Sequence, residues 1–150
     1  VDKSDMAYMR GLEEKYNVFT HLTPSYGLNL GCIAVKRMIS ITQYGDVLPC
    51  PYIHTSIGNV FHEPLKDIIA RGMNIKFFGK HIGTCLIAES RPFIDKYVAR
   101  HIYGKSLPVP WNEVFTDKDL INPNLPQMKS SEPVACGNCT ACATNADTSP

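Results

Sequence analysis

The sequence of 150 residues has no long apolar run and no excess of charge of either sign. Its hydrophobic residues, 44% of the total, form short stretches that fall well below the ~18 apolar residues of a membrane-spanning helix. The formal net charge is +1, so electrostatics give no reason to expect nucleic acid or an anionic membrane as a partner. No basic and then apolar secretory leader opens the sequence, and we expect a cytoplasmic protein.

Common catalytic signatures are also missing. The sequence contains no glycine-rich phosphate loop and no His-Glu-x-x-His pattern. Cys50 lies between two prolines and Cys85 follows Gly83 and Thr84, and neither context is typical of a cysteine hydrolase. We therefore assign no catalytic residue from the sequence.

Six cysteines in 150 residues are too few for a small disulfide scaffold. They are unevenly spaced, with three single cysteines followed by a tight C-x2-C-x2-C run: Cys32, Cys50, Cys85, Cys136, Cys139 and Cys142. Three thiols crowded into a few residues suit a metal or an iron–sulfur cluster better than disulfides. We expect such ligation for most of the six, with disulfides or inert buried thiols as the alternatives.

A β-hairpin is predicted between the first two cysteines, with strands near 36–43 and 46–50. Ile39 and Ile41 alternate with polar neighbours, which is the period of a half-buried strand. Gly45 suits the positive φ of a tight turn. The turn would fold the chain back and bring Cys32 and Cys50 together, as a metal centre requires.

Three helices complete the expected α+β fold, in which a small hairpin packs on two or three helices and a long irregular tail follows. Their signals are helical spacing of apolar residues, proline near the start and glycine at the end. The predicted ranges are 4–17, about 63–72 with Gly72 at its end, and about 91–104. We expect Trp111, Phe77 and Phe78 to lie in the core.

Three regions are predicted along the chain. Residues 1–30 are a helix and an extended lead-in, and the helix could be the remnant of a preceding larger domain, such as a barrel, or an ordinary surface helix of this domain. Residues 31–104 are the cluster-binding domain. Residues 105–150 are an irregular tail with the second cysteine group.

The segment from Gly31 to Ile69 resembles a known pattern. It combines Gly31-Cys32-Ile33-Ala34, then Gly45-Asp46-Val47-x-Pro49-Cys50-Pro51, then Gly58-Asn59-Val60 and the helix Pro64-Leu65-x-x-Ile68-Ile69. This arrangement is similar to the C-terminal auxiliary-cluster region of radical S-adenosylmethionine enzymes, known as the SPASM domain or, in its shorter form, the twitch domain. The resemblance covers residues of about 30–100.

The resemblance implies that Cys32, Cys50 and Cys85 bind an iron–sulfur cluster, and that Gly45, Gly58 and Asn59 shape the backbone around it. Only Cys85 follows the hairpin before the terminal run, which favours the shorter type with a single cluster. A fourth ligand could come from the terminal run, from His54 or His81, from a partner region, or from substrate. Cys136, Cys139 and Cys142 could hold a second cluster, hold zinc with a distant residue, or be free thiols.

By the same resemblance, the parent protein would be a maturase or synthase that modifies a peptide, a cofactor or a small molecule. The cluster would transfer electrons or anchor substrate. The C-x3-C-x2-C motif of the radical-generating barrel is missing, so S-adenosylmethionine would be used only through a separate barrel, the expected partner. The alternatives are a stand-alone ferredoxin-like electron carrier and a zinc-stabilised interaction domain.

Overall fold

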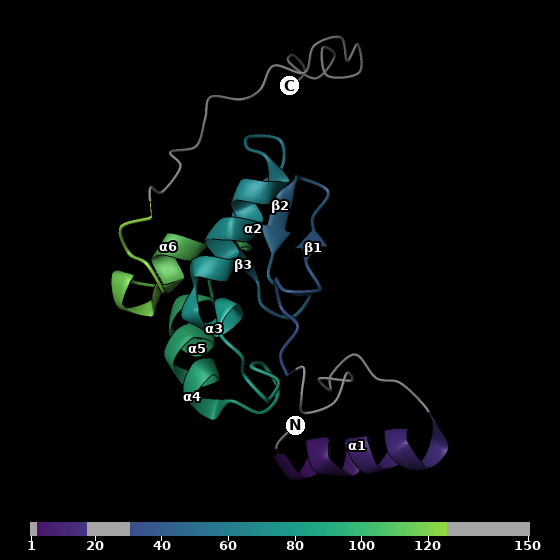
Figure 1. Cartoon of the computed structure of the whole chain (residues 1–150). Coiled ribbons are helices and arrows are strands. Elements are labelled where there is room, and N and C mark those ends of the chain that lie inside the picture. The colour runs from purple at the N-terminus through teal and green to yellow at the C-terminus, as the bar shows by residue number, and fades with distance from the viewer. Residues whose placement is uncertain (1–2, 18–30, 126–150) are drawn as a thin grey trace, which may run out of the picture.

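A computed structural model of the chain describes residues 3–17 and 31–125 (Figure 1). The fold is an α+β arrangement of short helices and two small sheets, as the sequence predicts. Within the described residues, no helix is long and apolar enough to cross a membrane. The elements are α1 (Lys3–Tyr16), β1 (Ser40–Ile41), β2 (Asp46–Leu48), β3 (Thr55–Ser56), β4 (Gly58–Asn59), α2 (Leu65–Asn74), α3 (Lys76–Gly79), α4 (Arg91–Phe93), η1 (Ile94–Val98), α5 (Ala99–His101), β5 (Val109–Pro110), α6 (Trp111–Val114) and η2 (Asp117–Asp119).

The predicted hairpin is present, although its strands are shorter than expected. β1 pairs antiparallel with β2, and β4 pairs antiparallel with the other edge of β2, in the order β1-β2-β4. Gly45 has a φ of +84° in the turn, as predicted. Ile41 is 49% exposed, so the expected half-buried face of the first strand is wrong at this position. Among the described residues β1 is a two-residue strand at the edge of the sheet, whereas the central strand β2 buries Val47 and Leu48.

Helix α2 packs against the sheet through Ile68, which is fully buried. The prediction that Gly72 ends this helix is wrong, because the helix continues to Asn74 and Ile75 follows it as the C-cap. A side chain at Gly72 would place its Cβ 2.8 Å from Cδ1 of Ile57 and 3.0 Å from Cγ1 of Val35. Gly72 therefore allows α2 to pack closely on the core, where a larger residue would collide with Ile57 and Val35.

The third predicted helix is a continuous run of three segments, α4, η1 and α5. Its middle, Ile94–Val98, is a π-helix, in which the turn is wider than in an α-helix. Phe93, Tyr97 and Val98 are buried, so the apolar residues of this run pack into the core.

The chain after this helix contributes to the same core. β5 pairs in parallel with β3, and Thr55 Oγ1 donates a 2.8 Å hydrogen bond to the carbonyl of Val109. Phe115 and Leu120 are buried, so residues 109–120 contain β5, α6 and η2 where the sequence suggests only irregular structure. The division into 1–30, 31–104 and 105–150 stays a prediction, and residues 126–150 of the expected tail lie outside the described residues.

An aromatic cluster forms the centre of the helical half. Phe77 contacts Phe93 and Tyr97 edge to face, with ring centroids 5.1 and 4.9 Å apart. Phe78 is fully buried and packs edge to face on Phe115. The expectation that Phe77, Phe78 and Trp111 belong to the core is confirmed. This cluster fixes α3 and α4, and the loop between them carries Cys85.

Candidate metal centre

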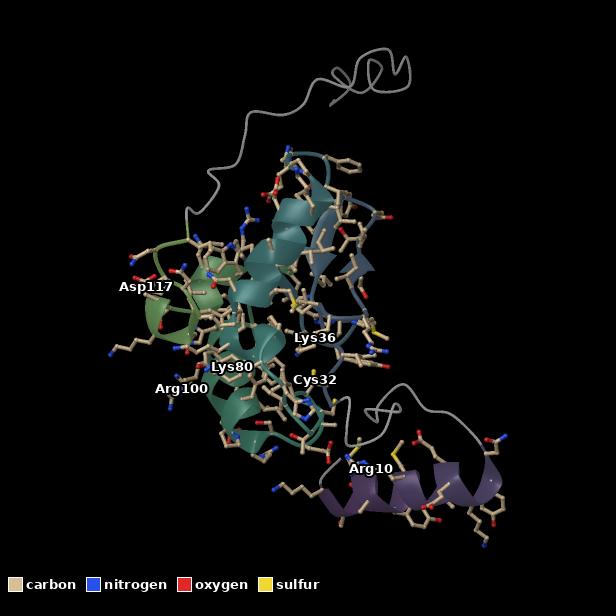
Figure 2. The ribbon with its side chains drawn as sticks, viewed as in Figure 1. Arg10, Cys32, Lys36, Lys80, Arg100 and Asp117 are labelled. Atoms are coloured by element: carbon tan, nitrogen blue, oxygen red, sulfur yellow. The ribbon has the colours of Figure 1, made fainter. Side chains whose placement is uncertain are left out.

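Three cysteines from distant parts of the sequence line one pocket. Cys32 is buried, while Cys50 and Cys85 are half-buried, and all three are free thiols. The rest of the lining is mostly apolar: Ile33, Ala34, Met38, Tyr52, Ile53, Leu86 and Ile87. The fold thus brings together the three cysteines that the sequence singles out as ligands. Figure 2 shows Cys32, with Lys36 nearby, on the part of the domain that lies closest to α1.

Two backbone hydrogen bonds hold the Cys32 segment against both of the other segments. The N–H of Cys32 donates to the carbonyl of Ile82 at 2.7 Å, which joins it to the loop that carries Cys85. The N–H of Val35 donates to the carbonyl of Pro49 at 3.0 Å, next to Cys50. Gly31 makes the first approach possible, because it has a φ of +60° and a Cβ there would lie 2.1 Å from the carbonyl oxygen of Ile82.

Backbone amides surround two of the three sulfurs in the same pattern. The N–H groups of Tyr52 and Ile53, two and three residues after Cys50, act to lower the pKa of its thiol, and the N–H of Ile53 also donates to the carbonyl of Cys50 at 3.3 Å. The N–H groups of Ile87 and Ala88 act in the same way on the pKa of Cys85, at the same offsets. These amides favour the thiolate, the form in which cysteine binds metal, and amide donors to sulfur are a usual outer shell of iron–sulfur clusters. Two turns of this kind give the pocket the chemistry of a thiolate metal centre.

Burial and mutual repulsion act against thiolates when no metal is present. The pKa of the Cys50 thiol is raised to about 11, mainly by burial and to a smaller extent by the nearby Cys32 and Cys85. Burial also raises the pKa of Cys85, with smaller contributions from Cys32 and Glu89. The metal-free pocket therefore holds neutral thiols at Cys50 and Cys85, and binding of cationic iron would release protons from them.

Two charged side chains lie beside the pocket. Glu89 is buried, and its Oε2 accepts a 2.8 Å hydrogen bond from the N–H of Cys85. Lys36 lies at the other side, with its Nζ 3.5 Å from the carbonyl oxygen of Cys32. Burial lowers the pKa of Lys36.

The predicted shaping residues Gly45, Gly58 and Asn59 support the hairpin and do not line the pocket. The side-chain amide of Asn59 donates to the carbonyl of Tyr44 at 2.9 Å, and its Oδ1 accepts the N–H of Phe61 at 2.9 Å. These bonds fix the turn at the far end of β2 from Cys50. Their influence on the cysteines is thus indirect, through the strand.

The candidates for a fourth ligand differ in position. His54 and His81 are not among the residues that line the cysteine pocket, and Nε2 of His54 lies 3.1 Å from the carbonyl oxygen of Pro51. Cys136, Cys139 and Cys142 lie outside the described residues, so their assignment as metal ligands stays a prediction.

Sequence reasoning missed Glu89 and the amide donors around the sulfurs. One signal was available, because each of Cys50 and Cys85 is followed by apolar residues at the second and third positions, whose amides form the donor pairs. A glutamate four residues after Cys85 was a weaker signal. The sequence alone does not show that the loop folds back and places the Glu89 carboxylate on the N–H of Cys85.

Comparison with known families agrees with this geometry. Residues 32–86 match the family model of SPASM, described as an iron–sulfur cluster-binding domain. This match is consistent with a SPASM iron–sulfur cluster-binding domain in residues 32–86. The matched SPASM segment begins at Cys32 and ends directly after Cys85, so it contains the three cysteines of the pocket. No curated protein and no solved structure matches the chain.

The pocket of the SPASM segment fits the cluster that its family implies. Three thiols supply three ligands, and a 4Fe–4S cluster with three cysteine ligands keeps one iron open to another ligand. Apolar side chains around the sulfurs exclude water, and the amide pairs at Cys50 and Cys85 offset negative charge on the thiolates. Cys32, Cys50 and Cys85 are the described residues that would hold it.

Proposed function

We propose that this chain is the auxiliary iron–sulfur domain of a radical S-adenosylmethionine maturase or synthase. The observation that carries the proposal is the pocket in which three cysteines meet, two of them with paired backbone amides at the sulfur. The match of residues 32–86 to the SPASM domain supports the cluster, and the resemblance described above supports the radical-enzyme setting.

In this function the cluster bound at the pocket would transfer electrons to or from a substrate, or anchor the substrate through an open iron. Cys50 and Cys85 are half-buried, so the pocket lies near enough to the surface for either role. The partner would be a radical S-adenosylmethionine barrel, and a cytoplasmic location would suit oxygen-sensitive thiolate chemistry. The substrate would be a peptide, a cofactor or another small molecule handled by that barrel.

A zinc ion and an iron–sulfur cluster differ in how closely their cysteine ligands must converge. A single zinc ion binds each cysteine sulfur at about 2.3 Å, so its ligands must converge on one point. Within residues 3–17 and 31–125, no group of three or more histidine, cysteine, aspartate or glutamate side chains has this arrangement. A cluster instead distributes its cysteine ligands over separate iron atoms.

The first experiment is anaerobic reconstitution of the full chain with iron and sulfide, followed by iron, sulfide and zinc analysis and by electron paramagnetic resonance after reduction with dithionite. We expect a brown protein with iron and sulfide in equal amounts and a reduced-cluster signal. A colourless protein that retains zinc and gains no iron would contradict the proposal.

A second step separates the auxiliary domain from a stand-alone carrier. The reconstituted, reduced chain is incubated with S-adenosylmethionine, and 5′-deoxyadenosine is measured with and without a purified radical S-adenosylmethionine barrel protein. We expect none from the chain alone and a higher yield from the barrel when the chain is added. Reversible cycling of two clusters with no effect on the barrel would favour the carrier.

A further inference from the structure

Glu89 makes two hydrogen bonds with the backbone of Cys85, four residues earlier in the same loop. Its backbone N–H donates to the carbonyl of Cys85 at 2.8 Å, and its Oε2 accepts the N–H of Cys85 at 2.8 Å. The side chain is only 4% exposed, so the carboxylate lies in a low-dielectric setting. The N–H of Cys85 donates to the Glu89 carboxylate. The N–H groups of Ile87 and Ala88 instead act on the Cys85 thiol and lower its pKa.

The second oxygen of the same carboxylate binds helix α1. Nη2 of Arg10 lies 2.6 Å from Oε1 of Glu89, and the arginine side chain is 29% exposed. Lys3 and Ser4 border the same cavity as Thr84 and Glu89, which also places the first turn of α1 beside the Cys85 loop. Figure 1 shows α1 next to the loop between α3 and α4, and Figure 2 shows Arg10 on that helix.

We propose that Glu89 is the positioning residue of the cluster: it orients the Cys85 ligand, and its charge, offset by Arg10 of α1, sets the cluster's reduction potential. This inference rests on the proposed cluster at Cys32, Cys50 and Cys85. It gives α1 a specific effect on the cluster's reduction potential. Among the described residues, Arg10 of this helix is the only cation paired with the Glu89 carboxylate.

A cluster that accepts one electron from a donor such as dithionite gains one negative charge, and a buried carboxylate nearby opposes that gain. Arg10 cancels part of this repulsion. The two charges should therefore shift the potential in opposite directions when removed one at a time.

The test uses the reconstituted full chain and three single variants. Glu89→Gln keeps an oxygen that can accept the N–H of Cys85 but removes the charge. Arg10→Met removes the cation and leaves Glu89 in place. Glu63→Gln is the matched control, because Glu63 also accepts hydrogen bonds from an arginine, Arg71, and its side chain is only 10% exposed. It lies just before α2, whereas Glu89 accepts the N–H of Cys85.

The measurement is the midpoint potential from a redox titration followed by electron paramagnetic resonance, with iron per chain determined on the same samples. For Glu89→Gln we expect reduction to become at least tenfold more favourable, a rise of about 59 mV for one electron. For Arg10→Met we expect a shift to a more negative potential, and Arg10→Lys should restore the original value. Glu63→Gln should leave the potential unchanged.

The outcomes separate this inference from the proposed function. If the original chain binds no iron, the proposed function fails. If Glu89→Gln binds iron fully and keeps the original potential, the inference fails while the cluster stands. If Glu89→Gln binds no iron, Arg10→Met decides, and an unchanged potential in that variant overturns the inference.

Discussion

Gly31 should be the most sensitive position next to the cysteines that is not itself a ligand. Its φ is +60°, and a Cβ at this position would lie 2.1 Å from the carbonyl oxygen of Ile82 and 2.7 Å from its carbonyl carbon. Real Cβ atoms essentially never approach closer than 3.0 Å, so Gly31→Ala must move the two segments apart by roughly 0.9 Å. The same two segments carry Cys32 and Cys85.

Two terms contribute to the expected cost. The left-handed backbone costs an alanine about 1–2 kcal/mol, and a contact with rigid backbone adds about 1–3 kcal/mol. Gly104→Ala is the matched control, because Gly104 has a φ of +75° and no atom within 4 Å of its Cβ position. Gly104→Ala should therefore lose only the about 1–2 kcal/mol that the left-handed backbone costs an alanine.

The assay is urea unfolding of the metal-free chain together with iron per chain after anaerobic reconstitution. We expect Gly31→Ala to lose more stability than Gly104→Ala and also to lose most of its iron, because metal sites tolerate only about 0.2 Å of error in ligand distance. Full iron binding in Gly31→Ala would refute the argument that this close approach aligns Cys32 with Cys85. Equal stability losses in the two variants would refute the contribution of the contact.

Three further predictions concern the thiols and the core. Because the pKa of Cys50 is raised to about 11, mainly by burial, its contribution to the stability of the metal-free chain is complete below about pH 9 and is lost as the pH rises to 11; this loss is roughly 3 kcal/mol. In urea unfolding across this range, Cys50→Ser should lose less stability than the unchanged chain, with a smaller loss remaining because burial also raises the pKa of Cys85. Cys85→Ser and Cys50→Ser should each lower iron per chain after reconstitution, whereas unchanged iron would remove that cysteine from the ligand set. Phe78→Ala should cost about 3–5 kcal/mol in urea unfolding, since Phe78 is fully buried, and a loss below 1 kcal/mol would contradict its place in the core.

Local signals predicted that Cys32 and Cys50 meet across the hairpin, whereas Cys85 was assigned to the same site only through the family resemblance. Gly45 and the prolines around Cys50 mark the hairpin, and the three cysteines meet where the chain folds back. Glu89 and Arg10 were not predictable, since 79 residues separate the two ends of their ion pair. Such a contact depends on tertiary packing of α1, which has no signature in either local sequence.

The same distinction explains the errors in the fold. Gly72 was taken as a helix end because glycine commonly follows a helix, but here it allows α2 to approach Ile57. Residues 109–120 have little periodicity, yet Val109 and Phe115 are buried by the pairing of β5 with β3 and by the aromatic cluster. Short elements of this kind are stabilised by what they pack against, which a local pattern does not encode.

The most direct measurement counts iron and sulfide in a chain in which Cys136, Cys139 and Cys142 are all changed to serine. This variant keeps Cys32, Cys50 and Cys85 as its only cysteines. After anaerobic reconstitution we predict about four iron and four sulfide per chain, as in a single 4Fe–4S cluster. Iron near zero in this variant, with iron retained by the unchanged chain, would contradict the claim that Cys32, Cys50 and Cys85 hold the cluster without the terminal cysteines.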